Sequence, residues 1–111
     1  LTMLARCRAA GALLQVNAGS LLGQHGERAQ RVARRLLSLG WVDYLASDHH
    51  ARGVPATGRA VDLLQGEGYE MQARRLTEEN PARILAGEGP LPVEPIAHRR
   101  RRWWSRLFGA R

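Results

Sequence analysis

Residues 11–50, GALLQVNAGSLLGQHGERAQRVARRLLSLGWVDYLASDHH, decide the fold of this chain. The run 11–19 is short and apolar, which is typical of a strand covered on both faces in a parallel sheet. Residues 27–40 carry an apolar stripe at helical spacing and end at Gly40, which predicts an amphipathic helix. That stripe consists of Ala29, Val32, Ala33, Leu36 and Leu37. The run 41–48 is the next predicted strand, so the order is strand, crossover helix, parallel strand, and the fold class is α/β.

The residues after the second strand are predicted to be mainly helical. Residues 59–68 predict a short helix that glycines stop, and residues 69–87 predict two more helices. Asn80 is expected as the N-cap of the second of these, with Pro81 in its first turn and Gly87 at its end. Two strands cannot make a sheet with two buried faces, so we expect further strands upstream or in a partner.

The charge is concentrated at one end of the chain. The 111 residues have a net charge of +7, of which residues 96–111 contribute +6, because they hold six arginines and no acid. The basic character therefore belongs to the tail and does not indicate a polyanion-binding domain. No apolar run approaches the roughly 20 residues of a membrane span, and Cys7 is the only cysteine, so we expect a cytoplasmic protein.

The division we expect is a folded part over residues 1–88, a linker over 89–97 and a tail over 98–111. Prolines and glycines make the middle segment an extended linker rather than a packed element. If the tail is helical, its large apolar residues share one face, as in an interfacial membrane anchor at the inner membrane. The expected membrane contacts are Arg99, Arg100, Arg101, Arg102, Trp103, Trp104, Leu107 and Phe108. A solvated, unstructured tail is the alternative, and nucleic acid is the partner we favour least.

Asp48 and His50 form the clearest candidate site. Side chains alternate along a strand, so these two project to one side and His49 projects to the other. A carboxylate and a neutral imidazole at the carboxyl end of a parallel strand suit manganese, iron or zinc. The simpler alternative is that Asp48 caps the following turn.

The wider pattern resembles a known family. LLQVNAGSLLGQHG, a basic amphipathic helix, VDYLASDHHAR and ENPARIL follow one another as in the C-terminal part of the PHP (polymerase and histidinol phosphatase) family. The capsule-biosynthesis tyrosine phosphatases of bacteria are the most similar branch. The resemblance implies a distorted (β/α)7 barrel, of which this chain is a C-terminal fragment. It also implies a cluster of up to three metal ions, commonly Mn²⁺, for which Asp48 and His50 of the SDxH motif are ligands.

The implied chemistry is hydrolysis of phosphotyrosine on a membrane-bound bacterial tyrosine kinase by a metal-activated water. Asp48 and His50 would be the catalytic residues, Arg52 would bind phosphate, and Asn17 would hydrogen-bond a metal ligand or substrate unless it only caps a turn. His25 is expected to be exposed. A cysteine-phosphatase loop is excluded, because its arginine would stand six residues after Cys7, where Leu13 stands.

Four points stay open at this level. The other ligands of the family would lie upstream, so we expect the fragment alone to be inactive. A different PHP or amidohydrolase-like hydrolase, acting on histidinol phosphate, an amide or a nucleic-acid end, is the second interpretation. A non-enzymatic module that binds membranes or polyanions is the third, and the sequence leaves a homo-oligomer open.

Overall fold

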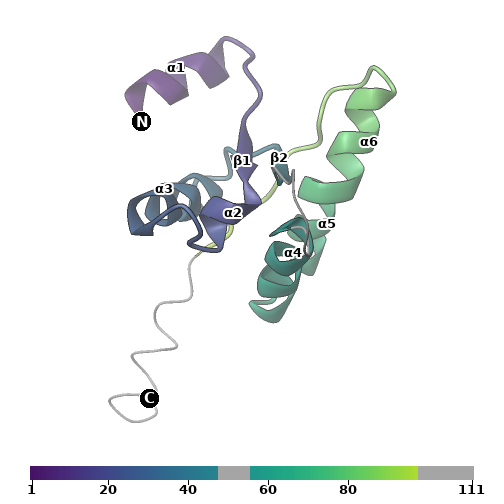
Figure 1. The fold of residues 1–111 in the computed structure, drawn as a ribbon. Coiled ribbons are helices and arrows are strands. Elements are labelled where there is room, and N and C mark those ends of the chain that lie inside the picture. The colour runs from purple at the N-terminus through teal and green to yellow at the C-terminus, as the bar shows by residue number, and fades with distance from the viewer. Residues whose placement is uncertain (48–55, 98–111) are drawn as a thin grey trace, which may run out of the picture.

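A computed structural model describes residues 1–47 and 56–97 of the chain (Figure 1). The elements follow one another as α1 (Thr2–Ala9), β1 (Gln15–Asn17), α2 (Ala18–Leu21), α3 (Glu27–Ser38), β2 (Tyr44–Ala46), α4 (Ala56–Gly66), α5 (Glu70–Arg74), the π-helical turn η1 (Arg75–Glu79) and α6 (Asn80–Leu85).

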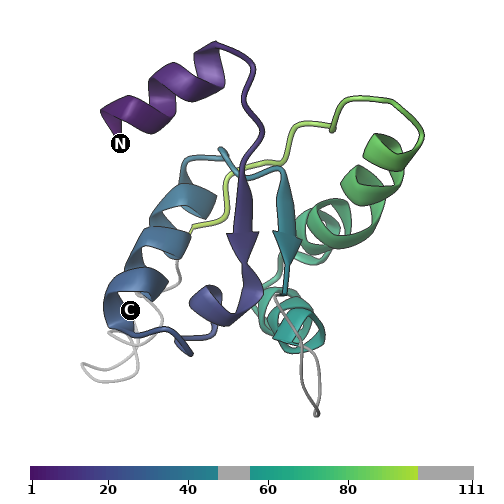
Figure 2. The ribbon, with the colours of Figure 1, turned by 45° about the horizontal axis from the view of Figure 1, so that its top comes forward.

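The two strands form a parallel pair, with Val16 opposite Leu45 and Asn17 opposite Ala46. α3 connects them, so the predicted strand–helix–strand unit is confirmed, although each strand is only three residues long. Figure 2 shows the strands side by side, with α3 beside β1 and the helices α4 to α6 beside β2. The α/β class is thus confirmed for this unit, and the barrel stays a prediction.

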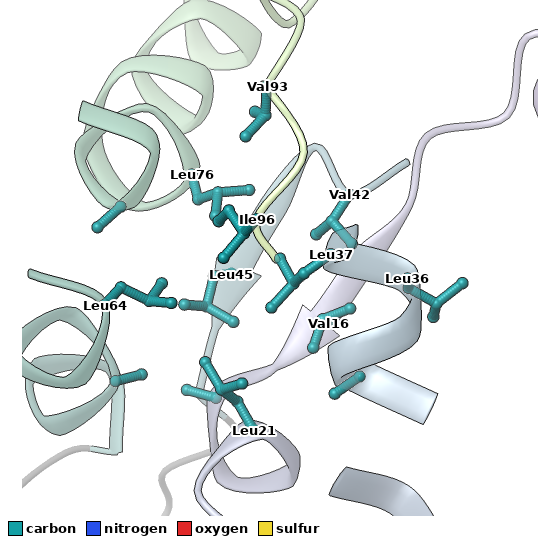
Figure 3. Close-up of a cluster of buried hydrophobic side chains, with 14 residues drawn as sticks. Val16, Leu21, Leu36, Leu37, Val42, Leu45, Leu64, Leu76, Val93 and Ile96 are labelled. Atoms are coloured by element: carbon teal, nitrogen blue, oxygen red, sulfur yellow. The ribbon is translucent and has the colours of Figure 1, made fainter. Parts of the chain in front are cut away.

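One apolar core joins α3 to the group formed by α4, α5, η1 and α6. Leu37 from α3, Leu45 from β2, Leu64 from α4 and Leu76 from η1 all lie in it, and each is at most 2 % exposed (Figure 3). The Arg34 guanidinium also links these groups, since it donates to both carboxylate oxygens of Glu67, at 2.8 and 2.9 Å. The core therefore fixes α3 and α4 relative to the same strands.

The predicted stripe of α3 is buried only in part. Ala33, Leu36 and Leu37 are buried as expected, whereas Val32 is 48 % exposed. Val32 lies on the side of α3 that lines an open cavity beside Val16 of β1. The stripe is thus wider than the area that this two-stranded sheet covers.

Residues 70–85 form one continuous helical stretch, so the prediction of two separate helices is wrong. Asn80 has α-helical backbone angles (φ −66°, ψ −41°) and is not an N-cap. Its N–H bonds the Arg75 carbonyl five residues back, which is the π-helical pattern. Pro81 lacks an N–H and would crowd a regular helix, and the wider turn before it accommodates the ring. Gly87 has φ +80° after the last turn, as predicted for the end of the helix.

The segment 88–97 has no helix or strand, as its prolines and glycines predict, but it is not an unpacked linker. Val93 is 7 % exposed and Ile96 is fully buried, and both belong to the core. The Ile96 N–H donates to the Leu37 carbonyl of α3 at 2.9 Å. Figure 2 shows this segment crossing from the end of α6 to α3, and we call it the strap. The linker prediction fails because two well-spaced apolar residues outweigh the composition around them.

Candidate functional site at the carboxyl end of the sheet

The carboxyl ends of β1 and β2 meet at one rim, because the strands are parallel and in register. Asn17 ends β1, Ala46 ends β2 opposite it, and Ser47 follows directly. In Figure 2 both arrows point to this rim, where α2 also lies. Open α/β sheets bind their ligands at such a rim, so these residues mark the candidate site.

Asn17 has a structural role that one of its two sequence-based interpretations anticipated. Its Oδ1 accepts the Gly19 N–H at 2.8 Å and thereby caps α2, and its extended backbone (ψ 126°) is usual for an N-cap. The cap does not engage the amide nitrogen of Asn17. The side chain is half-buried and lines the cavity beside the rim, so a second interaction is sterically open.

His25 lies over this rim, which sequence reasoning did not predict. It is exposed, as expected, but a Cβ placed on Gly19 would be 2.9 Å from His25 Nε2 and from Gln24 Oε1, and 3.1 Å from Asn17 Oδ1. Three polar side chains therefore converge over the bare backbone of Gly19. The only hint in the sequence was the pair of glycines around Gln24 and His25.

Backbone geometry explains how the loop folds back. Gly23 and Gly26 have φ values of +84° and +98°, a region that glycine adopts at little cost. The Gln24 N–H donates to the Gly19 carbonyl at 2.9 Å, and Gln30 Nε2 donates to the Leu21 carbonyl at 3.0 Å. The loop between α2 and α3 is thus tied to α2 at both ends.

A cavity of about 480 Å³ opens beside the rim. Its polar end consists of Asn17, Ser20, His25 and Arg28. Its apolar wall consists of Val16, Ala29, Val32, Ala33 and Leu36. The cavity is wide open, and its apolar wall lies on the side of α3 that the two-stranded sheet leaves uncovered. Its polar end lies at the rim and is the part relevant to the candidate site.

The predicted metal and phosphate ligands, Asp48, His50 and Arg52, lie outside the described residues, as does the basic tail 98–111. Across residues 1–47 and 56–97 there is no cluster of three or more His, Cys, Asp or Glu side chains able to hold a metal ion. Cys7 is exposed on α1. Within the same ranges, no helix is both long and apolar enough to cross a lipid bilayer.

Comparison with known proteins identifies a family. The family model described as "Capsular polysaccharide synthesis, CpsB/CapC" matches residues 1–86. No curated protein and no solved structure matches the chain. The matched span contains both strands, the loop that carries His25, the SDHH sequence at 47–50 and the helical stretch up to Leu85, and it stops before the strap.

Proposed function

The chain belongs to the CpsB/CapC family of capsular polysaccharide synthesis proteins, as its resemblance predicted, and from this membership we propose that it is part of a metal-dependent protein-tyrosine phosphatase. In this proposal the intact protein hydrolyses phosphotyrosine on the membrane-bound kinase that controls capsule or exopolysaccharide assembly. The family match over residues 1–86, with the SDHH sequence inside it, is the observation that carries the proposal.

The described geometry supports a site at the carboxyl rim. Tyr44 and Ala46 of β2 share a sheet face with their partners Gln15 and Asn17. Asp48 and His50 continue the same two-residue alternation in the sequence, so they are expected on the face that Asn17 shares. The predicted ligands are therefore expected to follow β2 at the rim that Asn17 also marks.

A barrel completed by further strands accounts for one buried group. The Tyr44 hydroxyl is buried and has no hydrogen-bond partner within the described part of the chain. It borders a cavity of about 240 Å³ that Gln15, Pro81 and Ile84 also line. Buried polar groups in proteins are nearly always satisfied, so this face is suited to receive further polypeptide. We propose that it faces the interior of the (β/α)7 barrel implied by the family.

Asp48 and His50 are the proposed metal ligands, and their carboxylate and imidazole suit Mn²⁺, with Fe or Zn as alternatives. A bound divalent cation would supply an activated water and would neutralise charge on the phosphoryl oxygens. Two side chains cannot complete such a cluster, and the described residues add no further cluster of donors. We propose that further residues of the intact protein complete the cluster, so the chain alone should bind the metal weakly and be inactive.

Other residues would orient the substrate. Arg52 is the proposed phosphate ligand, since guanidinium forms strong paired hydrogen bonds with phosphate oxygens. The amide nitrogen of Asn17 would hydrogen-bond a metal ligand or the substrate. The basic aromatic tail would hold the protein at the anionic inner membrane, where a membrane-bound kinase presents its phosphotyrosines at high local concentration.

The proposal is tested with the intact protein and four substrates: a phosphotyrosine peptide, p-nitrophenyl phosphate, histidinol phosphate and a nucleic-acid 3′-phosphate. We expect Mn²⁺-dependent turnover of the first two, and loss of that turnover with a chelator. Preference for histidinol phosphate or the nucleic-acid end would assign another hydrolase of the PHP class. Binding of anionic liposomes without turnover of any substrate would leave the chain as a membrane-binding module.

A further inference from the structure

We propose that His25 and Arg28 form a second anion-binding subsite at the rim, which takes an acidic group of the substrate peptide other than the scissile phosphate. The inference rests on the proposed phosphatase function and adds to it the substrate feature that these residues recognise. The shared chemistry is an anionic oxygen group, supplied either by an Asp or Glu carboxylate or by a second phosphotyrosine.

The position of the subsite comes from the strand register. Asn17 and Ala46 are paired at the ends of adjacent strands, and the loop after β1 brings the His25 imidazole back over Gly19, beside Asn17. Arg28, on the first turn of α3, lines the same cavity as His25. A peptide bound at the end of β2 would therefore extend past these two side chains.

The two basic residues at this position have no partner in the described part of the chain. Arg34 and Arg75 are held by carboxylates, and Arg8 and Arg83 bond backbone carbonyls. Neither His25 nor Arg28 has a hydrogen bond or ion pair within residues 1–47 and 56–97. Exposed arginines such as Arg31 and Arg35 share this property, but they do not line the cavity at the rim. The acidic neighbour Glu27 is exposed and does not line the cavity. A guanidinium or an imidazole N–H that lines a cavity without an acid partner there can donate to an anionic ligand.

Gly19 supports the same assignment, because its lack of a side chain makes room for the imidazole. Its backbone φ is not positive, so the turn itself does not require glycine there. A methyl group would meet His25 Nε2, Gln24 Oε1 and Asn17 Oδ1 at 2.9–3.1 Å. All three are ends of flexible side chains, so an alanine can be accommodated only if the polar side chains move.

The experiment compares kcat/KM of the intact protein with Mn²⁺ on three phosphotyrosine peptides, whose flanking residues are neutral, glutamate-rich or a second phosphotyrosine. p-Nitrophenyl phosphate reports the chemical step. We expect the wild-type protein to prefer the anionic peptides over the neutral one. Arg28→Ala and His25→Gln should each reduce that preference about tenfold, the loss typical of one charge-assisted hydrogen bond. Arg31→Ala is the matched control, since Arg31 is exposed on the same helix and does not line the cavity.

Gly19→Ala is a second test that keeps both the His25 and the Arg28 side chains. It should reduce the preference for anionic peptides in the same direction as His25→Gln, because the methyl group displaces the imidazole. Circular dichroism checks that the variants are folded. The two anionic peptides identify the group that the subsite binds. If the variants lose only the preference for the doubly phosphorylated peptide, the group is a phosphate. If they also lose the preference for the glutamate-rich peptide, the subsite binds carboxylates as well.

The experiment distinguishes failure of the proposed subsite from failure of the proposed phosphatase function. Turnover of p-nitrophenyl phosphate with unchanged peptide preference in both variants would overturn the subsite and leave the phosphatase function standing. Folded variants that lose p-nitrophenyl phosphate turnover as completely as peptide turnover would also overturn it, because the residues would then serve the chemical step. A wild-type protein that hydrolyses no aryl phosphate would overturn the proposed function, and the subsite with it.

Discussion

The two ends of the sheet use polar side chains in opposite ways. At the amino end, Asp43 accepts the Leu14 N–H through Oδ2 at 2.8 Å and donates its own N–H to the Leu14 carbonyl at 2.8 Å. Asn80, fully buried, donates to the carbonyls of Asp43 and Leu91 and accepts the Leu91 N–H. At the carboxyl end, His25 and Arg28 face a cavity instead.

The contrast indicates that the amino end of the sheet serves stability, whereas the carboxyl end is the expected place of the reaction. Both polar atoms of the Asn80 amide are bonded, which ties Asp43 just before β2, the helical stretch 70–85 and the strap together at one point. Arg8 adds a contact from α1, since it donates to the Trp41 carbonyl at 2.7 Å and lies 5.7 Å from the Trp41 ring centroid. In folds with parallel strands the carboxyl end usually carries the reaction and the opposite end the stability, and we expect this chain to follow that rule.

The largest effect is expected when the predicted metal ligands at the carboxyl end are replaced. Asp48→Ala and His50→Ala should each lower phosphotyrosine turnover of the intact protein by at least about a hundredfold, because even residues that only support a metal ligand cost 10–100-fold. Steady-state kinetics with Mn²⁺ measures the loss, and circular dichroism checks that the fold is kept. His49→Ala, with its side chain expected on the opposite face, is the control. Full activity of the Asp48 variant would remove the contrast between the two ends.

The strap should be essential to the stable end. Ile96→Ala removes a fully buried side chain, so we expect the free energy of unfolding to fall by about 3 kcal/mol in urea denaturation. Leu85→Ala is the matched control, since Leu85 is 89 % exposed and its change should stay within about 0.5 kcal/mol. Equal stability of the two variants would restore the interpretation of 89–97 as a free linker.

Asn80 tests the polar connection at the same end. Asn80→Ala deletes three hydrogen bonds and leaves two carbonyls and one N–H without their partner, so a loss of about 2–3 kcal/mol is expected. The effect should appear in thermal or urea unfolding without a change in KM. Glu78→Ala, exposed on the same helical stretch, is the control. A wild-type unfolding curve for the Asn80 variant would show that the amide does not hold the strap.

The smallest effect is expected for the cap at the carboxyl end. Asn17→Ala removes the acceptor for the Gly19 N–H and should cost about 1 kcal/mol. Asn17→Asp keeps an acceptor at this position, so its unfolding free energy should remain near that of the wild type. If the aspartate variant is stable but turns over substrate more slowly, the amide nitrogen has the binding role that we propose for it.

Regular features were predictable from local sequence. The crossover helix, the parallel strand pair, the glycine ends at Gly40 and Gly87, and the family were all predicted from apolar spacing and motif order. Apart from the exposed Val32 of α3, the errors concern residues 75–97. The Asn80–Pro81 pair has the composition of a helix start, yet the helical stretch continues through it by a π-turn, because burial of Leu76 and the bonds of Asn80 outweigh local preference.

The amino-acid order alone determined the α/β unit, the basic tail and the SDHH sequence, because these depend on residue spacing over a few turns of chain. Tertiary structure alone decided that the strap is packed, that Asn80 joins three segments and that His25 returns to the rim of β1. Each of these depends on contacts between residues that are brought together by folding, such as Ile96 with Leu37 or Leu91 with Asn80. Such contacts cannot be predicted from the spacing of residues along a short stretch of chain.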